Sequence, residues 1–325
     1  MKIGYACINM QLSYPTKYGN KPRGTQPITT NRSMIRRTFD EKGVDYASEL
    51  TLQNVKDLNS IIGWNILHGY DFYRLSSDMA PWKTEYEWDD LKDIDEIKQW
   101  LHSAGTMAIT HGVRLTAHPG PFNVLVSPNE SVVENTIKDL TIHGDIFDMM
   151  GLSRTPHNKL NIHCNGVYGD KLSAMDRFCK NFERLPESVQ TRLTVENDDK
   201  ASMYSVVDLM YIHERIGIPI VFDYHHHKFC TGDLSEQEAL ELAISTWPEG
   251  IKPIVHYSES KALHEGNESL KPQAHSDYIN DLPDLYGNDV DVMVEAKAKE
   301  LSILPFIKSN KCEYSGLLST SSYAS

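Results

Sequence analysis

The sequence predicts an α/β fold, a closed (β/α)8 TIM barrel with its functional residues at the mouth formed by the C-terminal ends of the strands. Eight short β-branched segments alternate with longer amphipathic segments along most of the chain, as expected for parallel strands joined by helices. A doubly wound open sheet is the alternative, but no GxGxxG motif follows the first segment. The predicted strands cover residues 2–9, 71–77, 113–119, 160–166, 193–199, 219–225, 252–258 and 291–297, and the predicted helices include 93–112, 130–150, 203–217 and 235–247.

The chain has 325 residues, an ordinary length for one barrel. We expect residues 1–310 to form a single barrel domain and residues 311–325, which end in STSSYAS, to be a disordered tail. No window of 18 apolar residues and no signal-peptide pattern occurs, so we expect no membrane association. Five scattered cysteines are typical of a reducing compartment and predict an intracellular protein, without distinguishing cytoplasm or nucleoid from nucleus.

The charge distribution leaves the question of nucleic-acid binding open. A net charge of −13 argues against such a partner, but acids gathered around divalent ions would be neutralised in the working protein. Between residues 17 and 37 the charged residues are all basic, which indicates either a solvated loop or a loop that contacts phosphates. These residues are Lys17, Lys21, Arg23, Arg32, Arg36 and Arg37.

Each predicted strand becomes polar at its C-terminal end. The residues concerned are Asn9, Ser76, Ser77, His118, His163, Glu196, Asp223, His256 and Glu295. A single histidine at a strand end is more often a structural residue than a ligand. Three histidines and three carboxylates at six strand ends are different, because unpaired acids are costly near a core and repel one another. Metal binding is therefore the simplest explanation.

The segment VFDYHHHKFC (221–230) contributes a further candidate ligand. Asp223 ends a strand, and His226, three residues later, can reach a neighbouring ion, whereas His225 and His227 are expected to flank the site or face solvent. His275, in the loop after the seventh strand, is another candidate. Mixed histidine and carboxylate ligands suit Mn²⁺ or Zn²⁺, and their number predicts two or three ions. These residues alone fit both a metal-dependent phosphodiesterase and a metal-dependent sugar isomerase.

Nine motifs, in order along the chain from about Lys2 to Lys308, make the sequence closely resemble the UV damage endonuclease family. They are GYACIN, FYRLSS, AHPGPF, NIHCNGVYGDK, LTVENDD, VFDYHHH, VHYSES, AHSDYI and DVMVEAKAKE. The family is related to the abasic-site endonucleases of the endonuclease IV type. The resemblance implies a TIM barrel that holds up to three ions, commonly Mn²⁺, with Zn²⁺, Co²⁺ and Mg²⁺ as alternatives.

Site residues follow from the same resemblance. His118 and His163 are implied to hold one ion, with Glu196 bridging it to a second. The second ion is implied to be bound also by Asp223, His256 and Glu295. A third is implied to be bound by His226 and His275, with Asp223 shared. Glu196, Asp223 and His256 are the residues on which catalysis is expected to depend. Tyr5 and Asn9 match residues that contact the lesion, and Pro121 and Phe122 match a wedge inserted into the base stack.

The chain departs from the family pattern at two positions of interest. Pro121 stands where a glutamine is common, so Phe122 alone would fill the gap in the stack. Ile254 stands where some members carry a modified lysine, and Lys252, one alternating pair earlier, is not assigned that role. A histidine that the family has after FYRLSS is also missing, with Glu85 or Tyr86 falling nearby.

The resemblance implies a DNA repair endonuclease that nicks the phosphodiester immediately 5′ of UV photoproducts by multi-metal-ion hydrolysis and so starts excision repair. Its partner would be damaged double-stranded DNA, bound by a monomer. An abasic-site endonuclease of the endonuclease IV type and a non-catalytic damage-binding protein are the alternatives. A sugar-phosphate isomerase is a more distant one, because a small-substrate enzyme has no use for the HPGPF loop.

Overall fold

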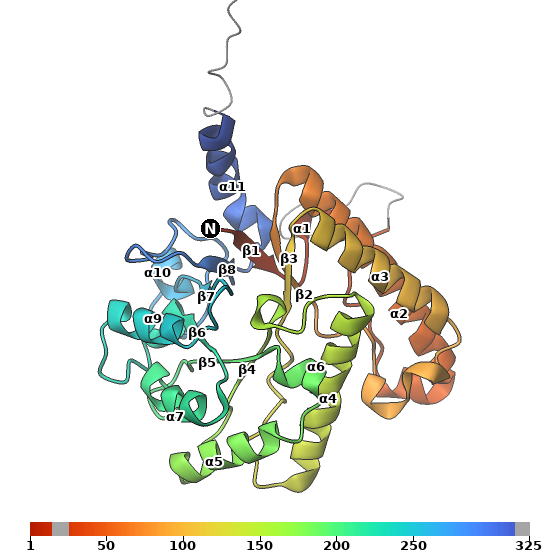
Figure 1. Ribbon diagram of the computed structural model, residues 1–325. Helices are drawn as coiled ribbons and strands as arrows, with labels where there is room; N and C mark the ends of the chain where they lie inside the picture. The colour runs from red at the N-terminus through yellow and green to blue at the C-terminus, as the bar shows by residue number, and fades with distance from the viewer. Residues whose placement is uncertain (15–25, 316–325) are drawn as a thin grey trace, which may run out of the picture.

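A computed structural model describes residues 1–14 and 26–315, and the side chains up to residue 307. Eight parallel strands form a closed barrel in sequential order, which confirms the predicted (β/α)8 fold (Figure 1). The strands are β1 (Ile3–Ala6), β2 (Phe72–Leu75), β3 (Arg114–Ala117), β4 (Leu160–His163), β5 (Leu193–Glu196), β6 (Ile220–Asp223), β7 (Ile254–Tyr257) and β8 (Asp291–Val294). Each predicted strand segment therefore contains a strand, although each strand is only four residues long.

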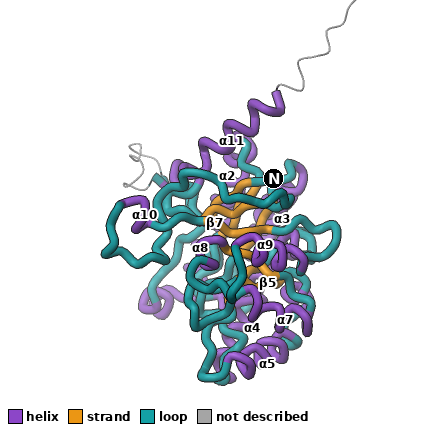
Figure 2. Tube along the Cα trace, turned by 90° about the vertical axis from the view of Figure 1, so that its left-hand side faces the viewer, coloured by secondary structure: helices purple, strands orange, loops and turns teal. Residues whose placement is uncertain are grey.

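Helices surround the strands, as the view in Figure 2 shows. They are α1 (Met10–Ser13), α2 (Arg36–His68), α3 (Ile94–Thr110), α4 (Glu130–Met149), α5 (Lys171–Phe182), α6 (Glu187–Gln190), α7 (Val206–Ile216), α8 (Tyr224–His227), α9 (Glu236–Ser245), α10 (Lys261–Glu265) and α11 (Glu300–Ser315), with the 3-10 turns η1 (Lys83–Glu85), η2 (Trp88–Asp90) and η3 (Pro156–Asn158). The four helices named from the sequence correspond to α3, α4, α7 and α9. In the described part of the chain, no helix is long and apolar enough to cross a membrane.

The helix starts show why these segments fold as they do. Ser205 and Ser235 begin α7 and α9 as capping boxes, in which the serine accepts from the third helical N–H and an acid there accepts from the serine N–H. Asn129 accepts from Ser131 N at the start of α4. The long helix α2 is broken at Gly43, where a φ of 67° suits glycine.

The strands separate two packed regions. Side chains such as Ile3, Leu115 and Val195 point outward and pack against the helices in the main core. A smaller apolar cluster of Ala6, Phe72, Val221, Trp247, Ile254 and Met293 forms a second buried region, and Gly4 leaves room for Phe72 and Met293 beside it. Ile254, at the position of the family's modified lysine, is thus an apolar core residue.

The N-terminal end of the barrel is closed by charged residues that take no part in the mouth. The Arg114 guanidinium and the Asp291 carboxylate are both buried and lie 2.8 Å apart. Lys252 Nζ lies 2.5 Å from Asp289 and 3.8 Å from Asp291, just before β7 begins. Because Lys252 lies at this end, the structure gives it no place among the predicted metal ligands.

The structure also bears on the expected domain boundary and on the basic run between residues 17 and 37. The expected boundary at residue 310 falls inside α11, which continues to Ser315, and residues 316–325 lie outside the described part. Of the basic run, Lys17, Lys21 and Arg23 also lie outside it. Arg32 pairs with Asp57 at 2.7 Å, Arg36 with Asp40 at 2.8 Å and Arg37 with Glu41 at 2.8 Å. These three arginines are thus engaged with acids of the same chain.

Candidate metal centre and DNA-contacting loop

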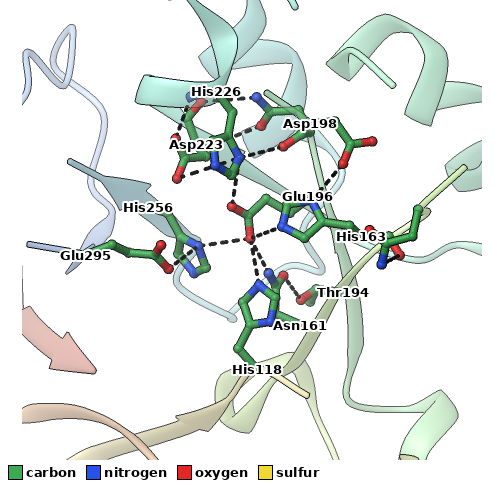
Figure 3. A network of polar contacts seen from close by, with 12 residues as sticks. His118, Asn161, His163, Thr194, Glu196, Asp198, Asp223, His226, His256 and Glu295 are labelled. Atoms are coloured by element: carbon green, nitrogen blue, oxygen red, sulfur yellow. Dashed lines mark hydrogen bonds and ion pairs between the residues drawn. The ribbon is translucent and has the colours of Figure 1, made fainter. Parts of the chain in front are cut away.

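The barrel mouth brings the predicted ligands together (Figure 3). They come from the ends of six strands, from α8 and from the loop before β8: His118, His163, Glu196, Asp223, His226, His256, His275 and Glu295. Two groups have ligand atoms that all lie within 4.8 Å of one another. The first is His118, His163 and Glu196, and the second is Glu196, Asp223 and His256. Glu196 belongs to both groups, as expected of a bridging carboxylate.

The Glu196 carboxylate is at the centre of this cluster. Its Oε2 lies 3.0 Å from His256 Nδ1, 3.4 Å from His118 Nε2 and 3.8 Å from His163 Nε2. Its Oε1 lies 3.3 Å from His226 Nδ1. Asn161 also donates a hydrogen bond to Oε2 and is itself held by Thr194 at 2.7 Å. The carboxylate is 1% exposed, so its orientation is fixed from several sides.

Four of the five histidines have the Nδ1 atom facing an oxygen atom of the protein. His118 Nδ1 lies 3.1 Å from the Pro119 carbonyl, and His226 Nδ1 lies 2.9 Å from the Asn197 carbonyl. The remaining two are His275, 3.1 Å from the Glu295 carbonyl, and His163, 3.1 Å from Asp198 Oδ1. Such partners fix the ring and leave Nε2 for an ion, which is the usual arrangement of metal-binding histidines.

His256 has the opposite orientation. Its Nδ1 faces Glu196 at 3.0 Å and Glu295 at 3.3 Å, so this nitrogen points into the cluster. Its Nε2 forms a hydrogen bond of 3.0 Å with Nζ of Lys159, which is fully buried. Burial lowers the pKa of Lys159 to about 7, although Glu196 opposes the shift.

The buried cluster shifts the pKa values of its members in opposite directions. Burial raises the pKa of Asp223 to about 7, with Glu196 and Glu295 adding to the rise. Burial alone would also raise the pKa of Glu196, but His256 and His163 hold it well below its usual range. Burial would lower the pKa of His163, yet Glu196 and Asp198 outweigh it and raise the value to about 9. In the metal-free protein, protons thus take part of the role that a divalent ion would have.

Unsatisfied atoms in the cluster fit a bound cation. Asp223 Oδ2 and His256 Nδ1 are buried and lack a hydrogen-bond partner among the described residues. Both atoms belong to the second ligand group. Buried polar atoms without partners are rare in proteins, and those at a set of carboxylate and imidazole donors are accounted for by a metal ion.

The third expected group is less compact. The His226 and His275 rings lie 6.3 Å apart between centroids, and His226 Nδ1 is 4.0 Å from Asp223 Oδ2. Among the described residues, the ligand atoms of this group do not all lie within 4.8 Å of one another, as those of the other two groups do. Their rings are nevertheless fixed by backbone carbonyls, so His226 and His275 stay predicted ligands.

The flanking histidines of the HHH run are not exposed to solvent. His225 is fully buried, with its ring centroid 5.3 Å from that of Phe229 and 5.4 Å from that of His275. His227 is 4% exposed and packs against Phe222. Of the alternatives that they flank the site or face solvent, the structure shows the first: α8 follows β6 directly, and both rings are covered.

A pocket of about 360 Å³ leads to the first ligand group. It is lined by His118, His163, Glu295, Arg74, Ser77, Asn165 and the segment Pro119–Pro121. Arg74, on β2, forms an ion pair with Glu295, and its Nε is buried without a hydrogen-bond partner among the described residues. The pocket therefore contains a guanidinium beside the candidate metal ligands, paired with the carboxylate of Glu295.

The wedge residues lie at the tip of a tight turn beside this pocket. Asn123 N donates to the Gly120 carbonyl at 3.2 Å, which places Pro121 and Phe122 at the two central positions of the turn. Proline favours the first of these positions because its φ is fixed. Phe122 is 88% exposed, an unusual position for a phenylalanine unless it contacts a partner.

Tyr5 and Asn9 are buried in this DNA-free structure, and their expected contact with a lesion stays a prediction. Tyr5 is 0% and Asn9 1% exposed. The Tyr5 hydroxyl donates to Asn65 of α2 at 2.7 Å and accepts from Asn9 at 3.0 Å. The Tyr5 ring also packs against Tyr70 and Tyr73. Both side chains thus join β1 to the surrounding helices.

Several supporting residues were not identified from the sequence. Lys159 and Asn161 alternate with His163 and could have been found by period-two spacing, because they share its face of β4. Asp198 lies two residues after Glu196 in the ENDD motif. Arg74 had no distinguishing signal, since a lone arginine in a strand segment is usually a surface residue.

Comparison with known proteins agrees with this geometry. Residues 1–323 match the family model described as UV-endonuclease UvdE. A UV-damage endonuclease of Schizosaccharomyces pombe is 34% identical over 310 residues, which cover 93% of this chain but 49% of that protein. A putative UV-damage endonuclease of Acanthamoeba polyphaga mimivirus is 30% identical, with 94% of this chain and 89% of the relative covered. The crystal structure of SacUVDE superposes with a TM-score of 0.80 at 29% identity and covers 97% of this chain and 99% of its own. The chain belongs to the UV-endonuclease UvdE family.

Proposed function

We propose that this protein is a metal-dependent DNA repair endonuclease that nicks a strand immediately 5′ of a UV photoproduct and leaves a 3′-hydroxyl. The observation that carries the proposal is the position of Glu196, which two potential ligand groups share at the barrel mouth. Family membership supplies the endonuclease class, and the exposed Phe122 beside the pocket supplies a means of engaging duplex DNA.

Each set of ligands would bind a separate metal ion. His118, His163 and Glu196 would hold one ion, and Glu196, Asp223, His256 and Glu295 a second; His226 and His275, with Asp223, would hold a third. Mn²⁺ is the proposed metal. Divalent ions held by ligand sets of this kind would activate water and stabilise the attacking and leaving oxygens of a phosphodiester.

The chain's own residues prepare the substrate and the ligands. The oxygens opposite Nδ1 of His118, His163, His226 and His275 fix the direction of each ring. Arg74 lines the pocket that leads to His118 and His163, and we propose that its guanidinium lies beside the substrate phosphate. Glu196, with a pKa well below its usual range, stays ionised and available to two ligand groups at once.

Damage recognition is assigned to Phe122. An aromatic ring stacked on an exposed base contributes about 1–3 kcal/mol. A damaged base pair is easier to unstack than an intact one, so an inserted ring favours distorted sites without reading the sequence. Cyclobutane dimers and 6-4 products both distort the duplex, and we propose both as substrates of a monomeric, intracellular enzyme.

Incision of a labelled duplex with one cyclobutane dimer tests the proposal. The protein is treated with a chelator, and Mn²⁺ is then added back. A nick on the 5′ side of the dimer that returns only with Mn²⁺ is expected. A matched duplex with an abasic site separates the main alternative, because preferential cutting of that duplex would identify an abasic-site endonuclease. Tight binding to the dimer without any nick would identify a damage-binding protein.

A further inference from the structure

His256 has Nδ1 turned toward two carboxylates of the cluster, Glu196 and Glu295, and Nε2 bonded to a lysine side chain. The other four histidines among the predicted ligands are held by oxygens at Nδ1. An imidazole turned this way needs a different partner, placed behind the ring at Nε2. Lys159 occupies that place, with Nζ 3.0 Å from Nε2.

The position of Lys159 is unusual for a lysine. It directly precedes β4, is 0% exposed and has Asn161 and His163 two and four residues further along the chain. Complete burial of a lysine side chain is costly, because its amine loses contact with water. The contact with His256 gives this buried amine a partner inside the barrel, and Glu196 lies close enough to interact with its charge.

We propose that Lys159 is a positioning residue of the metal centre. It holds the His256 ring so that Nδ1 faces Glu196 and Glu295, and it does so across the barrel, from the start of β4, rather than from β7 itself. Without it, a rotation of about half a turn about the Cβ–Cγ bond would turn Nδ1 away from Glu196 and put Cδ2 in its place, with little steric change. This inference rests on the metal centre of the proposed function. It adds a residue that orients His256, a member of the second ligand group.

The orientation has a direct consequence for metal binding. Partners that orient a ligand histidine from behind affect metal affinity by about 10- to 100-fold. Lys159 bonds to His256, and no hydrogen bond joins it to His118 or His163 among the described contacts. Its loss should therefore weaken the ion held by Asp223, His256 and Glu295 and spare the ion held by His118 and His163.

Mn²⁺ titration of the DNA-free protein, followed by the EPR signal of the free ion, tests the proposal without reference to cleavage. Lys159→Met keeps the length of the side chain and removes its polar end. We expect one Mn²⁺ to bind about 10- to 100-fold more weakly, with the other unchanged. In the His256→Asn background the same substitution should have no further effect, because residues that act through one another are non-additive.

A spectroscopic readout tests the ring orientation itself. With Zn²⁺ as a diamagnetic probe, ¹⁵N shifts of the histidine rings should identify His256 as coordinated through Nδ1 and His118 and His163 as coordinated through Nε2. Lys159→Met should remove the Nδ1 signature. Lys159→Gln, which keeps a polar end on a shorter stem, provides a second variant in case the methionine variant does not fold.

Lys83→Met is the matched control, because Lys83 is also a buried lysine, 6% exposed, but lies on η1 and bonds to the Tyr86 carbonyl. It should leave the Mn²⁺ titration unchanged. Equal titrations for Lys159→Met and wild type, an additive effect in the His256→Asn background, or the same loss in Lys83→Met would overturn the proposal. A wild-type protein that binds no Mn²⁺ would instead remove the metal centre on which the proposed function depends.

Discussion

Asn123 and Asp139 fix the turn that exposes Phe122. Nδ2 of Asn123 donates to Oδ2 of Asp139 on α4 at 2.7 Å and to the Gly120 carbonyl at 3.0 Å. Val124 N is held in turn by the Thr136 hydroxyl at 2.9 Å. The aromatic ring is thus presented on a turn that is tied to a long helix, and a ring fixed in this way loses little conformational freedom on binding.

Loosening this turn should weaken DNA binding even though Phe122 is kept. Asp139→Ala removes the acceptor from Asn123, so the ring has more conformations to lose on insertion. We expect lower affinity for a dimer-containing duplex, measured by fluorescence anisotropy in a chelator, and an unchanged incision rate at saturating protein. Equal affinities for variant and wild type would show that the turn is rigid without Asp139.

Removal of the ring should have a larger effect. Phe122→Ala should reduce affinity for the damaged duplex by about 1–3 kcal/mol, the usual contribution of one base–aromatic stack. Stability should hardly change, because the side chain is 88% exposed. Leu67→Ala, at an 80% exposed leucine where α2 leads to the opposite end of the barrel, is the control for loss of exposed apolar surface. An equal fall in binding of undamaged duplex would exclude a wedge.

Neutralising the shared carboxylate should stop the reaction. Glu196→Gln preserves the shape of the side chain but removes the charge next to His118, His163 and His256. We expect cleavage to be abolished. Binding of the damaged duplex should survive, because Glu196 is buried and its side chain is not exposed to DNA. Single-turnover incision and anisotropy on the same preparation measure both. Undiminished turnover would show that the centre lies elsewhere.

The buried lysine predicts a pH dependence of stability in the metal-free protein. The pKa of Lys159 is about 7 in the folded chain, against an ordinary value of 10.5. Between these values the unfolded chain holds a proton that the folded chain has released, so the free energy of unfolding rises with pH. The slope for one group is at most about 1.4 kcal/mol per pH unit.

Denaturant unfolding of wild type and Lys159→Met in a chelator, from pH 7 to 10, isolates this contribution. His163, with its pKa raised to about 9, has the opposite effect: its contribution is complete below the unfolded value and is lost as pH rises through 9. Because His163 is present in both proteins, the difference between them reports Lys159. Parallel pH profiles would mean that the lysine stays charged in the fold.

The barrel and most of its mouth could be predicted because both depend on local patterns. Alternation identified each strand segment, and a polar residue at each strand end pointed to the candidate ligands. The helix α2 was not named among the example helices, and its buried face carries polar residues such as Asn54 and Asn59. Asn54 donates to the Arg32 and Met79 carbonyls, and Asn59 donates to that of Trp100, so these amides are satisfied only in the folded chain.

What depends on the relation between strands could not be predicted. Tyr5 is implied by resemblance to contact the lesion, and the sequence alone did not show that its hydroxyl bonds to Asn65 of α2 while Gly4 lies against Phe72 and Met293. Lys159 and His256 are 97 residues apart in sequence and meet only across the closed barrel. The partner of such a histidine can therefore be identified only from the three-dimensional structure.

The concentration of buried charge at the barrel mouth links the amount of folded protein to the supply of metal. Glu196 and Asp223 are almost fully inaccessible, so folding without a cation must remove two carboxylates from water. An ion that binds only the folded chain adds about 2.7 kcal/mol to its stability at a concentration 100 times the dissociation constant. If the proposed metal centre is correct, metal starvation would reduce the lifetime of the protein against proteolysis as well as its activity.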